Sequence, residues 1–208
     1  MPDALSLGLV PWQMDAHTGA GDYAEQAAMA EGWGYRSFFL PENHFAPATP
    51  LPDPLLVLAV AASATREIQL GTTSWLLPIR EPLLAAAQAA SLDQLCGGRL
   101  ILGLGRGYRA DMLNAFGVPS ADKRNRFDAV LASMQAAWSG APVLDEQALV
   151  PLPLQRPHPP LWVAAFGPRA IAQAGRLGLP YFASPLESLA ELERNFEQHD
   201  SALAEHGR

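Results

Sequence analysis

One short segment of the chain combines a carboxylate, an amide and an imidazole. Glu42, Asn43 and His44 follow one another between Pro41 and Phe45. An imidazole beside a carboxylate can move a proton near neutral pH. The alternative is that His44 is only a structural hydrogen-bonding group in a turn, and its position favours neither reading. We take Glu42, Asn43 and His44 as candidate catalytic residues.

The segment 103–109 is the best candidate for an anion site. It reads Gly-Leu-Gly-Arg-Gly-Tyr-Arg, so glycines without Cβ expose backbone N–H groups around the guanidinium of Arg106. A guanidinium offers a planar fork of donors that suits phosphate. The spacing meets the dinucleotide-binding glycine pattern only loosely and lacks its helical context, which argues against a Rossmann site. The candidate cofactor-binding residues here are Gly105, Arg106, Gly107 and Tyr108.

Two further segments could contact the same ligand. Thr73 and Ser74 belong to a run of small and hydroxyl side chains inside an apolar stretch, where a flat ligand can approach the backbone closely. The alternative there is a β-bulge. Phe166 and Gly167 precede a helix whose first-turn N–H groups favour an anion, although most such turns only connect a strand to a helix.

Metal and thiol chemistry have little support in the sequence. The five histidines are not spaced as ligand pairs on one helix face or hairpin, so we expect no metal site. The one cysteine, Cys96, stands beside two glycines and is typical of a small buried residue rather than a nucleophile.

The elements that must position these residues follow an α/β pattern. Short, continuously apolar runs alternate with longer segments of helical period, which predicts parallel strands covered by helices. The expected strands are 5–10, 36–40, 68–77, 99–105, 161–166 and 181–184. In such a fold the loops that follow the strands meet at one face, so the candidate residues should converge there.

Helix boundaries are marked by capping residues. We expect Asp22 with Glu25 to form a capping box, Asp53–Pro54 and Pro82 to begin helices, and Gly97–Gly98 to end the second of these near Leu95. Other helices should carry an apolar face from Phe127 to Trp138 and begin near Pro168 and Ser188. The proline-rich stretch 139–160 is expected to be a loop crossing the barrel mouth.

Bulk composition excludes several classes of protein. With 208 residues and 49% apolar content we expect a single domain over 1–208. The net charge of −7, without a basic stripe, argues against nucleic acid as a partner. A single cysteine and no signal segment predict a cytoplasmic protein. The most apolar run, 55–64, is about half the length of a membrane span, so we expect no membrane insertion.

Read in order, these motifs resemble the bacterial-luciferase-like family of flavin-dependent monooxygenases. The match runs from Leu7 to the last expected helix. It is carried by Ala30–Tyr35, Leu40–Phe45, Leu70–Thr72, Leu77–Pro78, Pro82, Leu92–Leu95, Gly98–Leu100, Gly103, Gly105–Gly107, Phe116–Gly117, Arg126–Asp128, Pro160–Ala164, Ala174 and Gly178.

The resemblance implies a TIM-barrel-like (β/α) barrel that binds FMN. The cofactor would arrive reduced from a separate flavin reductase and would use O2 to oxidise a small-molecule organic substrate, and the chain would form a homo-oligomer, a dimer. Arg106 and the backbone at Gly167 would grip the flavin phosphate, and a non-prolyl cis peptide would fall at Thr73–Ser74 under the flavin ring. The family also includes F420-dependent reductases, which makes F420 the alternative cofactor.

The chain departs from the family in two ways that bear on activity. Asn43 stands where luciferases have their first, catalytically important histidine. About six βα units fit into the 208 residues, so the last two strands of the usual eight are missing. A non-catalytic flavin-binding protein or subunit is therefore the alternative function.

Overall fold

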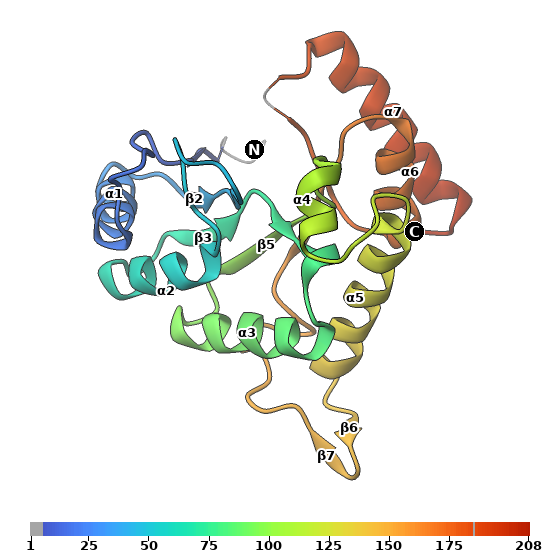
Figure 1. Ribbon diagram of the computed structural model, residues 1–208, viewed down its shortest axis with the longest axis horizontal. Coiled ribbons are helices and arrows are strands. Elements are labelled where there is room, and N and C mark those ends of the chain that lie inside the picture. Colours follow the sequence, from blue (N-terminus) through green and yellow to red (C-terminus); the bar gives the residue numbers. More distant parts are fainter. Residues whose placement is uncertain (1–5, 185) are drawn as a thin grey trace, which may run out of the picture.

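The computed structural model describes residues 6–184 and 186–208. Its main sheet contains seven strands that all pair in parallel (Figure 1). They are β1 (Gly8–Leu9), β2 (Ser37–Leu40), β3 (Gln69–Thr72), β4 (Trp75–Leu76), β5 (Leu100–Gly105), β8 (Leu161–Ala164) and β9 (Tyr181–Phe182). The order is β1-β2-β3-β5-β8-β9, and β4 also pairs with β5. The predicted start of the first strand at Leu5 lies outside the described residues.

The described residues also form seven α-helices, which are labelled in chain order in Figure 1. They are α1 (Ala20–Gly32), α2 (Pro54–Ala64), α3 (Pro82–Leu95), α4 (Ala110–Ala115), α5 (Lys123–Trp138), α6 (Pro168–Leu177) and α7 (Leu189–Glu205), with a 3-10 turn at Leu77–Ile79. α1 packs on α2, α3 on α5, and α6 on α7. The apolar positions of α5 predicted to face the sheet, including Phe127 and Met134, are buried.

The sheet is an incomplete barrel. β1 and β9 stand at the two ends of the strand order, and within the described residues no pairing joins them. The prediction of a TIM-barrel-like α/β fold with an incomplete barrel is therefore confirmed. Each end strand is short, which limits the row of backbone groups left open for pairing with another chain.

The predicted strand 68–77 is interrupted, so the prediction of one continuous strand was wrong. β3 pairs with the start of β5 at Leu70–Leu100, and β4 pairs with its end at Trp75–Leu104. Between these two pairs the register slips by one residue, as in a β-bulge. The extra length falls at Thr73–Ser74, whose peptide bond is cis as the resemblance implied.

Most helix boundaries agree with the capping signals. The Asp53 side chain accepts hydrogen bonds from the backbone N–H groups of Leu55 and Leu56, and Pro82 begins α3. The capping box predicted for Asp22 with Glu25 was wrong. α1 begins earlier, and Asp22 itself accepts the N–H of the N-cap residue Gly19 at 2.7 Å.

The stretch 139–160 was predicted to cross the barrel mouth, and this prediction was also wrong. It contains a hairpin of β6 (Pro142–Leu144) and β7 (Gln147–Ala148), seen at the bottom of Figure 1. Gln155 then donates to the carbonyl of Leu100, at the beginning of β5. A segment that leads from a helix into a parallel strand must return to the amino ends of the strands, which is the face opposite the functional loops.

Close backbone packing at Gly103 predicts sensitivity to a single methyl group. A Cβ there would lie 2.0 Å from the carbonyl oxygen of Thr72, which is backbone and cannot rotate away. We expect Gly103→Ala to lower the free energy of unfolding by about 1–3 kcal/mol or more, measured by urea denaturation. Gly21→Ala in α1, where a Cβ meets nothing within 4 Å, is the control and should be neutral or stabilising. Equal stability of the two variants would contradict the packing described.

Candidate active site

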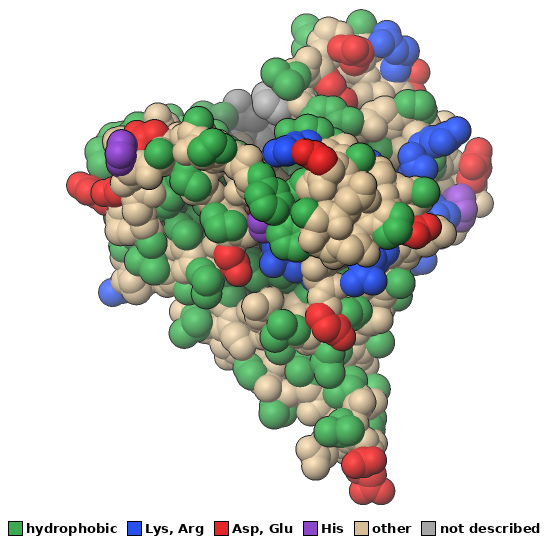
Figure 2. Space-filling view, in the orientation of Figure 1, with side chains coloured by type: hydrophobic (Ala, Val, Ile, Leu, Met, Phe, Trp, Pro, Cys, Tyr) green, Lys and Arg blue, Asp and Glu red, His purple; other side chains and the backbone are tan. Residues whose placement is uncertain are grey.

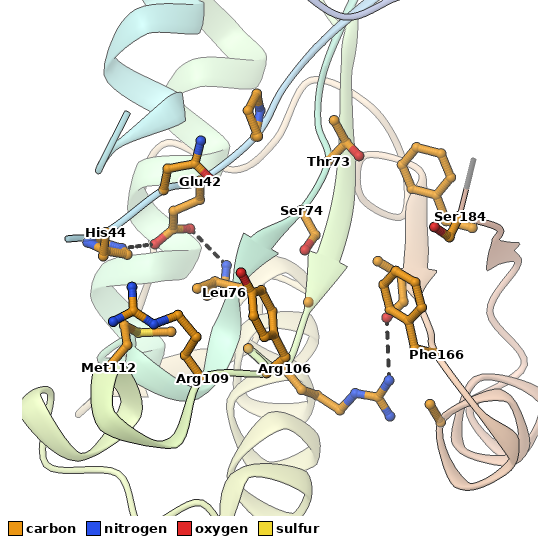
Figure 3. Close-up of a pocket in the computed structure, with 18 of the residues that line it drawn as sticks. Glu42, His44, Thr73, Ser74, Leu76, Arg106, Arg109, Met112, Phe166 and Ser184 are labelled. Carbon is orange, nitrogen blue, oxygen red and sulfur yellow. Dashed lines mark hydrogen bonds and ion pairs between the residues drawn. The ribbon is translucent and has the colours of Figure 1, made fainter. Parts of the chain in front are cut away.

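The carboxyl ends of the strands surround a cavity of about 620 Å³. Its lining comes from the loops after β1, β2, β3, β5, β8 and β9 and from the start of α5. In Figure 3, Glu42 and His44 lie on one side of the cavity, Arg106 and Phe166 lie on the other, and Ser74 lies between them. The predicted site residues that line it are Glu42, Asn43, His44, Thr73, Ser74, Gly105, Arg106, Gly107, Tyr108 and Phe166.

Glu42 is the centre of a buried hydrogen-bonding network. Its side chain is fully buried; one oxygen lies 2.5 Å from His44 Nε2 and also accepts from Arg80, and the other accepts the backbone N–H of Leu76 at 2.8 Å. Both oxygens of the carboxylate are therefore engaged by donors of the protein itself. Glu42 orients the His44 ring rather than facing a ligand itself.

His44 is held on a second side by an aromatic ring. The ring of Phe116 meets it edge-on, with centroids 4.8 Å apart. The side chain of His44 is only 10% exposed, yet the residue lines the cavity. With Nε2 directed to Glu42, Nδ1 is the nitrogen left to exchange a proton with a ligand.

Asn43 stabilises the shape of the loop. Its Nδ2 donates to the carbonyl of Thr49 at 3.2 Å, and its backbone pairs with Leu51. An amide cannot act as an acid or base. The role of Asn43 is therefore to fix the conformation of the segment that carries His44.

The segment Thr73–Ser74 lies against β5 in the middle of the cavity. A Cβ at Gly105 would stand 2.1 Å from Ser74 Oγ, so only glycine allows this approach. Thr72 Oγ1 donates to the carbonyl of Gly103 at 2.9 Å, fixing the start of the same segment. The small residues therefore bring backbone and one hydroxyl to the floor between His44 and Arg106.

Arg106 leaves the end of β5 and reaches across to the neighbouring β8 and α6. It donates to Gln173 Oε1 at 2.9 Å and to the carbonyl of Ala164 at 3.4 Å. The amide of Gln173 is held in turn by Asp128 at 2.7 Å. Burial, and then the positive charge of Arg124, lower the pKa of Arg106 below its ordinary value. The guanidinium is thus positioned before any ligand arrives.

Two basic residues of this site were missed by sequence reasoning. Lys123 and Arg124, in the first turn of α5, line the cavity, and Lys123 donates to the carbonyl of Gly107 at 3.1 Å. The sequence did contain a signal for them. Cations are disfavoured at the N-terminus of a helix, where the macrodipole is positive, so two basic residues in a first helical turn are unusual. On the face shown in Figure 2, basic side chains gather mainly over the half that contains α4 to α7.

The remaining predicted residues differ in how they meet the cavity. Tyr108 is 87% exposed and Phe166 is 64% exposed, so both belong to its rim. Gly167 is the N-cap of α6, with a φ of 75°, and does not line the cavity. β5 and β8 are neighbours, as expected, so Arg106 and the start of α6 do lie on adjacent strands.

Some kinds of chemistry find no support in the part of the chain that the structure describes. There is no group of three or more potential metal-ligating side chains within residues 6–184 and 186–208. Burial raises the pKa of the Cys96 thiol, which disfavours a reactive thiolate. No helix over those residues is long and apolar enough to cross a membrane.

The geometry agrees with a comparison against known protein families. The family model described as luciferase-like monooxygenase matches residues 7–208. This chain belongs to that family. The flavin-dependent trigonelline monooxygenase oxygenase component of Acinetobacter baylyi is 30% identical over 78% of this chain and 48% of its own length. The chain spans about half the length of the curated relatives it matches.

Solved structures of the same fold include the oxygenating constituent of 3,6-diketocamphane monooxygenase of Pseudomonas putida in complex with FMN. Its TM-score is 0.85 at 21% identity, over 99% of this chain and 64% of that one. The coenzyme F420-dependent tetrahydromethanopterin reductase of Methanopyrus kandleri gives a TM-score of 0.77 at 21% identity, over 98% and 61%. At this identity both likenesses concern the fold.

Glu42 in this luciferase-like chain should be important for stability as well as for the position of His44. We expect Glu42→Gln to lower the free energy of unfolding by about 1–3 kcal/mol, because the largely buried side chain of Arg80 loses its charged partner. The neighbouring Glu81→Gln, at an exposed position, is the matched control and should stay within about 0.5 kcal/mol of the wild type. Urea denaturation measures both, and an unchanged midpoint for Glu42→Gln would contradict the role assigned to the network.

Proposed function

We propose that this chain is the flavin-binding part of an oxidoreductase that uses reduced FMN and O2 to oxidise a small organic substrate. One observation carries the proposal. A single cavity has a fixed guanidinium, Arg106, on one side and the paired Glu42 and His44 on the other. A site for phosphate at Arg106 and a site for proton transfer at His44 therefore lie at opposite ends of the cavity floor.

The residues present fit FMN. The cavity has a volume typical of cofactor sites, which run from roughly 300 to 1,000 Å³. Arg106 would hold the phosphate, and the backbone and hydroxyl of Ser74 would lie beneath the ring. Leu76 and Met112 give the walls apolar surface that excludes water from the reacting atoms. Bound in its reduced form, FMN would supply the electrons that activate O2.

The protein's own contribution to the chemistry is orientation and proton transfer. Glu42 fixes the His44 ring through Nε2, which leaves Nδ1 for the substrate. Phe116 packs against the ring and reduces its freedom to rotate. General acid–base catalysis by such a positioned imidazole is typically worth about 10²–10⁴-fold.

The relatives support a flavin and leave F420 as the competing cofactor. One relative at 30% identity is flavin-dependent, one structure of the same fold contains FMN, and another belongs to an F420-dependent reductase. F420 would make the reaction a hydride transfer that does not consume oxygen. We favour FMN because monooxygenases are found both among the relatives by sequence and among the solved structures of the same fold.

A non-catalytic flavin-binding role is the second candidate function, and Asn43 favours it. This amide is engaged with Thr49 and offers no proton. On this reading the chain binds flavin without substrate-dependent turnover, and Asn43→His does not create activity.

We further propose a reductase that supplies reduced flavin, and a second copy of the chain as partner. The proposal of a second copy is supported by α2. All residues of this helix except Ser63 are apolar, and yet Leu56 is 68% exposed and Val60 is 40% exposed. A helix that is apolar on all sides is normally covered on all sides, and a two-fold axis would place this patch against itself. A monomeric sedimentation coefficient would contradict this part.

Cofactor titration tests the proposed function. We expect the 208-residue chain to quench FMN fluorescence with a Kd on the order of 1 µM, about −8 kcal/mol. Arg106→Met should weaken this binding by roughly 10-fold or more, because a charge-assisted hydrogen bond is lost. Oxygen consumption with reduced FMN above the protein-free rate then separates oxygenase chemistry from F420-dependent hydride transfer. Failure to bind either FMN or F420 would sink the proposal.

A further inference from the structure

One oxygen of Glu42 is shared by two side chains of different charge. Oε1 lies 2.5 Å from His44 Nε2 and also accepts from the guanidinium of Arg80. The second oxygen is occupied by the backbone N–H of Leu76. Arg80 is always positive, whereas an imidazole is positive only when both of its nitrogens carry a proton. Arg80 and a protonated His44 would therefore compete for the charge of one carboxylate.

The side chain of Arg80 is positioned for Glu42 and for little else. Its guanidinium carbon lies 5.2 Å from the centroid of the buried Trp75 ring, and its backbone N–H donates to the carbonyl of Leu77 at 2.9 Å. Within residues 6–184 and 186–208, Glu42 is the one hydrogen-bond acceptor that the guanidinium contacts. Arg99, by contrast, donates five hydrogen bonds to segments around the ends of α2 and α3. Arg99 has the contacts of a structural arginine, and Arg80 does not.

Arg80 acts on the cavity only through this carboxylate. It is not among the described residues that line the cavity, whereas Glu42 and His44 are. The other charged side chain labelled on their side in Figure 3, Arg109, is matched by Asp111. The charge felt by the His44 ring is therefore set mainly by Glu42 and Arg80.

Burial makes this balance of charges important. The Glu42 side chain is fully buried, and those of His44 and Arg80 are largely buried, so solvent screens their charges weakly. Beside Glu42 alone, a nearby negative charge would favour the protonated imidazole. Because Arg80 already matches that charge, protonating His44 would place a second cation at the same carboxylate. The neutral ring avoids this cost.

We propose that Arg80 is a positioning residue that keeps His44 neutral, so that the imidazole serves the cavity as a base. A neutral ring that donates through Nε2 to Glu42 leaves Nδ1 without a proton. Nδ1 then accepts a proton from a ligand hydroxyl: the O–H bond breaks, an N–H bond forms, and the electron pair stays on the oxygen. The inference rests on the proposed function for the role of His44, although its test needs no flavin.

A merely structural role for Arg80 makes a different forecast. If Arg80 only stabilised the turn after β4, its loss would lower stability without changing the charge of His44. If it acts through the charge of Glu42, its loss should favour the protonated ring, and removing Glu42 as well should reverse that effect. The protonation state of His44 in single and double variants is therefore the informative measurement.

The experiment labels the histidines of the 208-residue chain with nitrogen-15 and records long-range nitrogen–proton correlation spectra near neutral pH, without cofactor. His44→Gln identifies the His44 signals among those of the five histidines. In the wild type, Nε2 should carry a proton and Nδ1 should not. In Arg80→Met, the ratio of protonated to neutral ring should rise roughly 10-fold or more.

Three further variants act as controls. Arg80→Lys keeps the charge, so its ratio should stay within about twofold of the wild type. The double variant Glu42→Gln/Arg80→Met removes both charges and should return to the neutral ring. Arg194→Met, at an exposed position on α7, removes an equal charge away from the cavity lining and should leave the His44 signals unchanged. Thermal melts verify that the variants are folded.

Several outcomes would overturn the inference. A protonated His44 in the wild type, or a wild-type ratio in Arg80→Met, would each do so. A double variant as protonated as Arg80→Met would show that Arg80 does not act through Glu42. If Arg80→Met does not fold, the wild type and Arg80→Lys still decide: a neutral ring in both supports the inference, and a protonated ring in either contradicts it. If these spectra agree and the chain binds no flavin, the proposed function alone has failed.

Discussion

Close packing of backbone against β5 is the constraint on which the site depends. All six residues of β5 are buried, and the strand pairs with β3, β4 and β8 at once. Gly103 and Gly105 leave room for Thr72 and Ser74, whose atoms occupy the space that side chains on β5 would need. Because these strands are parallel and in contact, their carboxyl ends form one floor.

The two ends of this floor are held by different means. Glu42 secures His44 through buried polar contacts with Arg80 and Leu76, which keep an imidazole in one orientation. At the other end, Arg106 is fixed by Gln173, while the excess positive charge with Lys123 and Arg124 is left for a ligand. The two ends therefore differ in charge, which fits a cavity that holds the phosphate of a cofactor at one end and carries out proton transfer at the other.

The sequence predicted the parts of the site that lie next to strands. Glu42 to His44, Ser74 and Arg106 each follow an apolar run, so the rule that strand ends converge placed them together. Lys123 and Arg124 were missed because they follow a helix and a turn, and only the packing of α5 brings them to the cavity. Arg80 could not be assigned to Glu42, since 38 residues separate the partners. The break between β3 and β4 falls at Thr73–Ser74, where the run of small and hydroxyl side chains had left a β-bulge as the alternative to a continuous strand.

Phosphorus-31 NMR of FMN bound to the 208-residue chain tests the central claim most directly. A phosphate held by Arg106 at this positively charged end of the cavity should stay dianionic, so its resonance should be displaced from that of free FMN and should not titrate between about pH 5 and 8. A resonance that titrates near pH 6, as a free phosphomonoester does, would contradict the account.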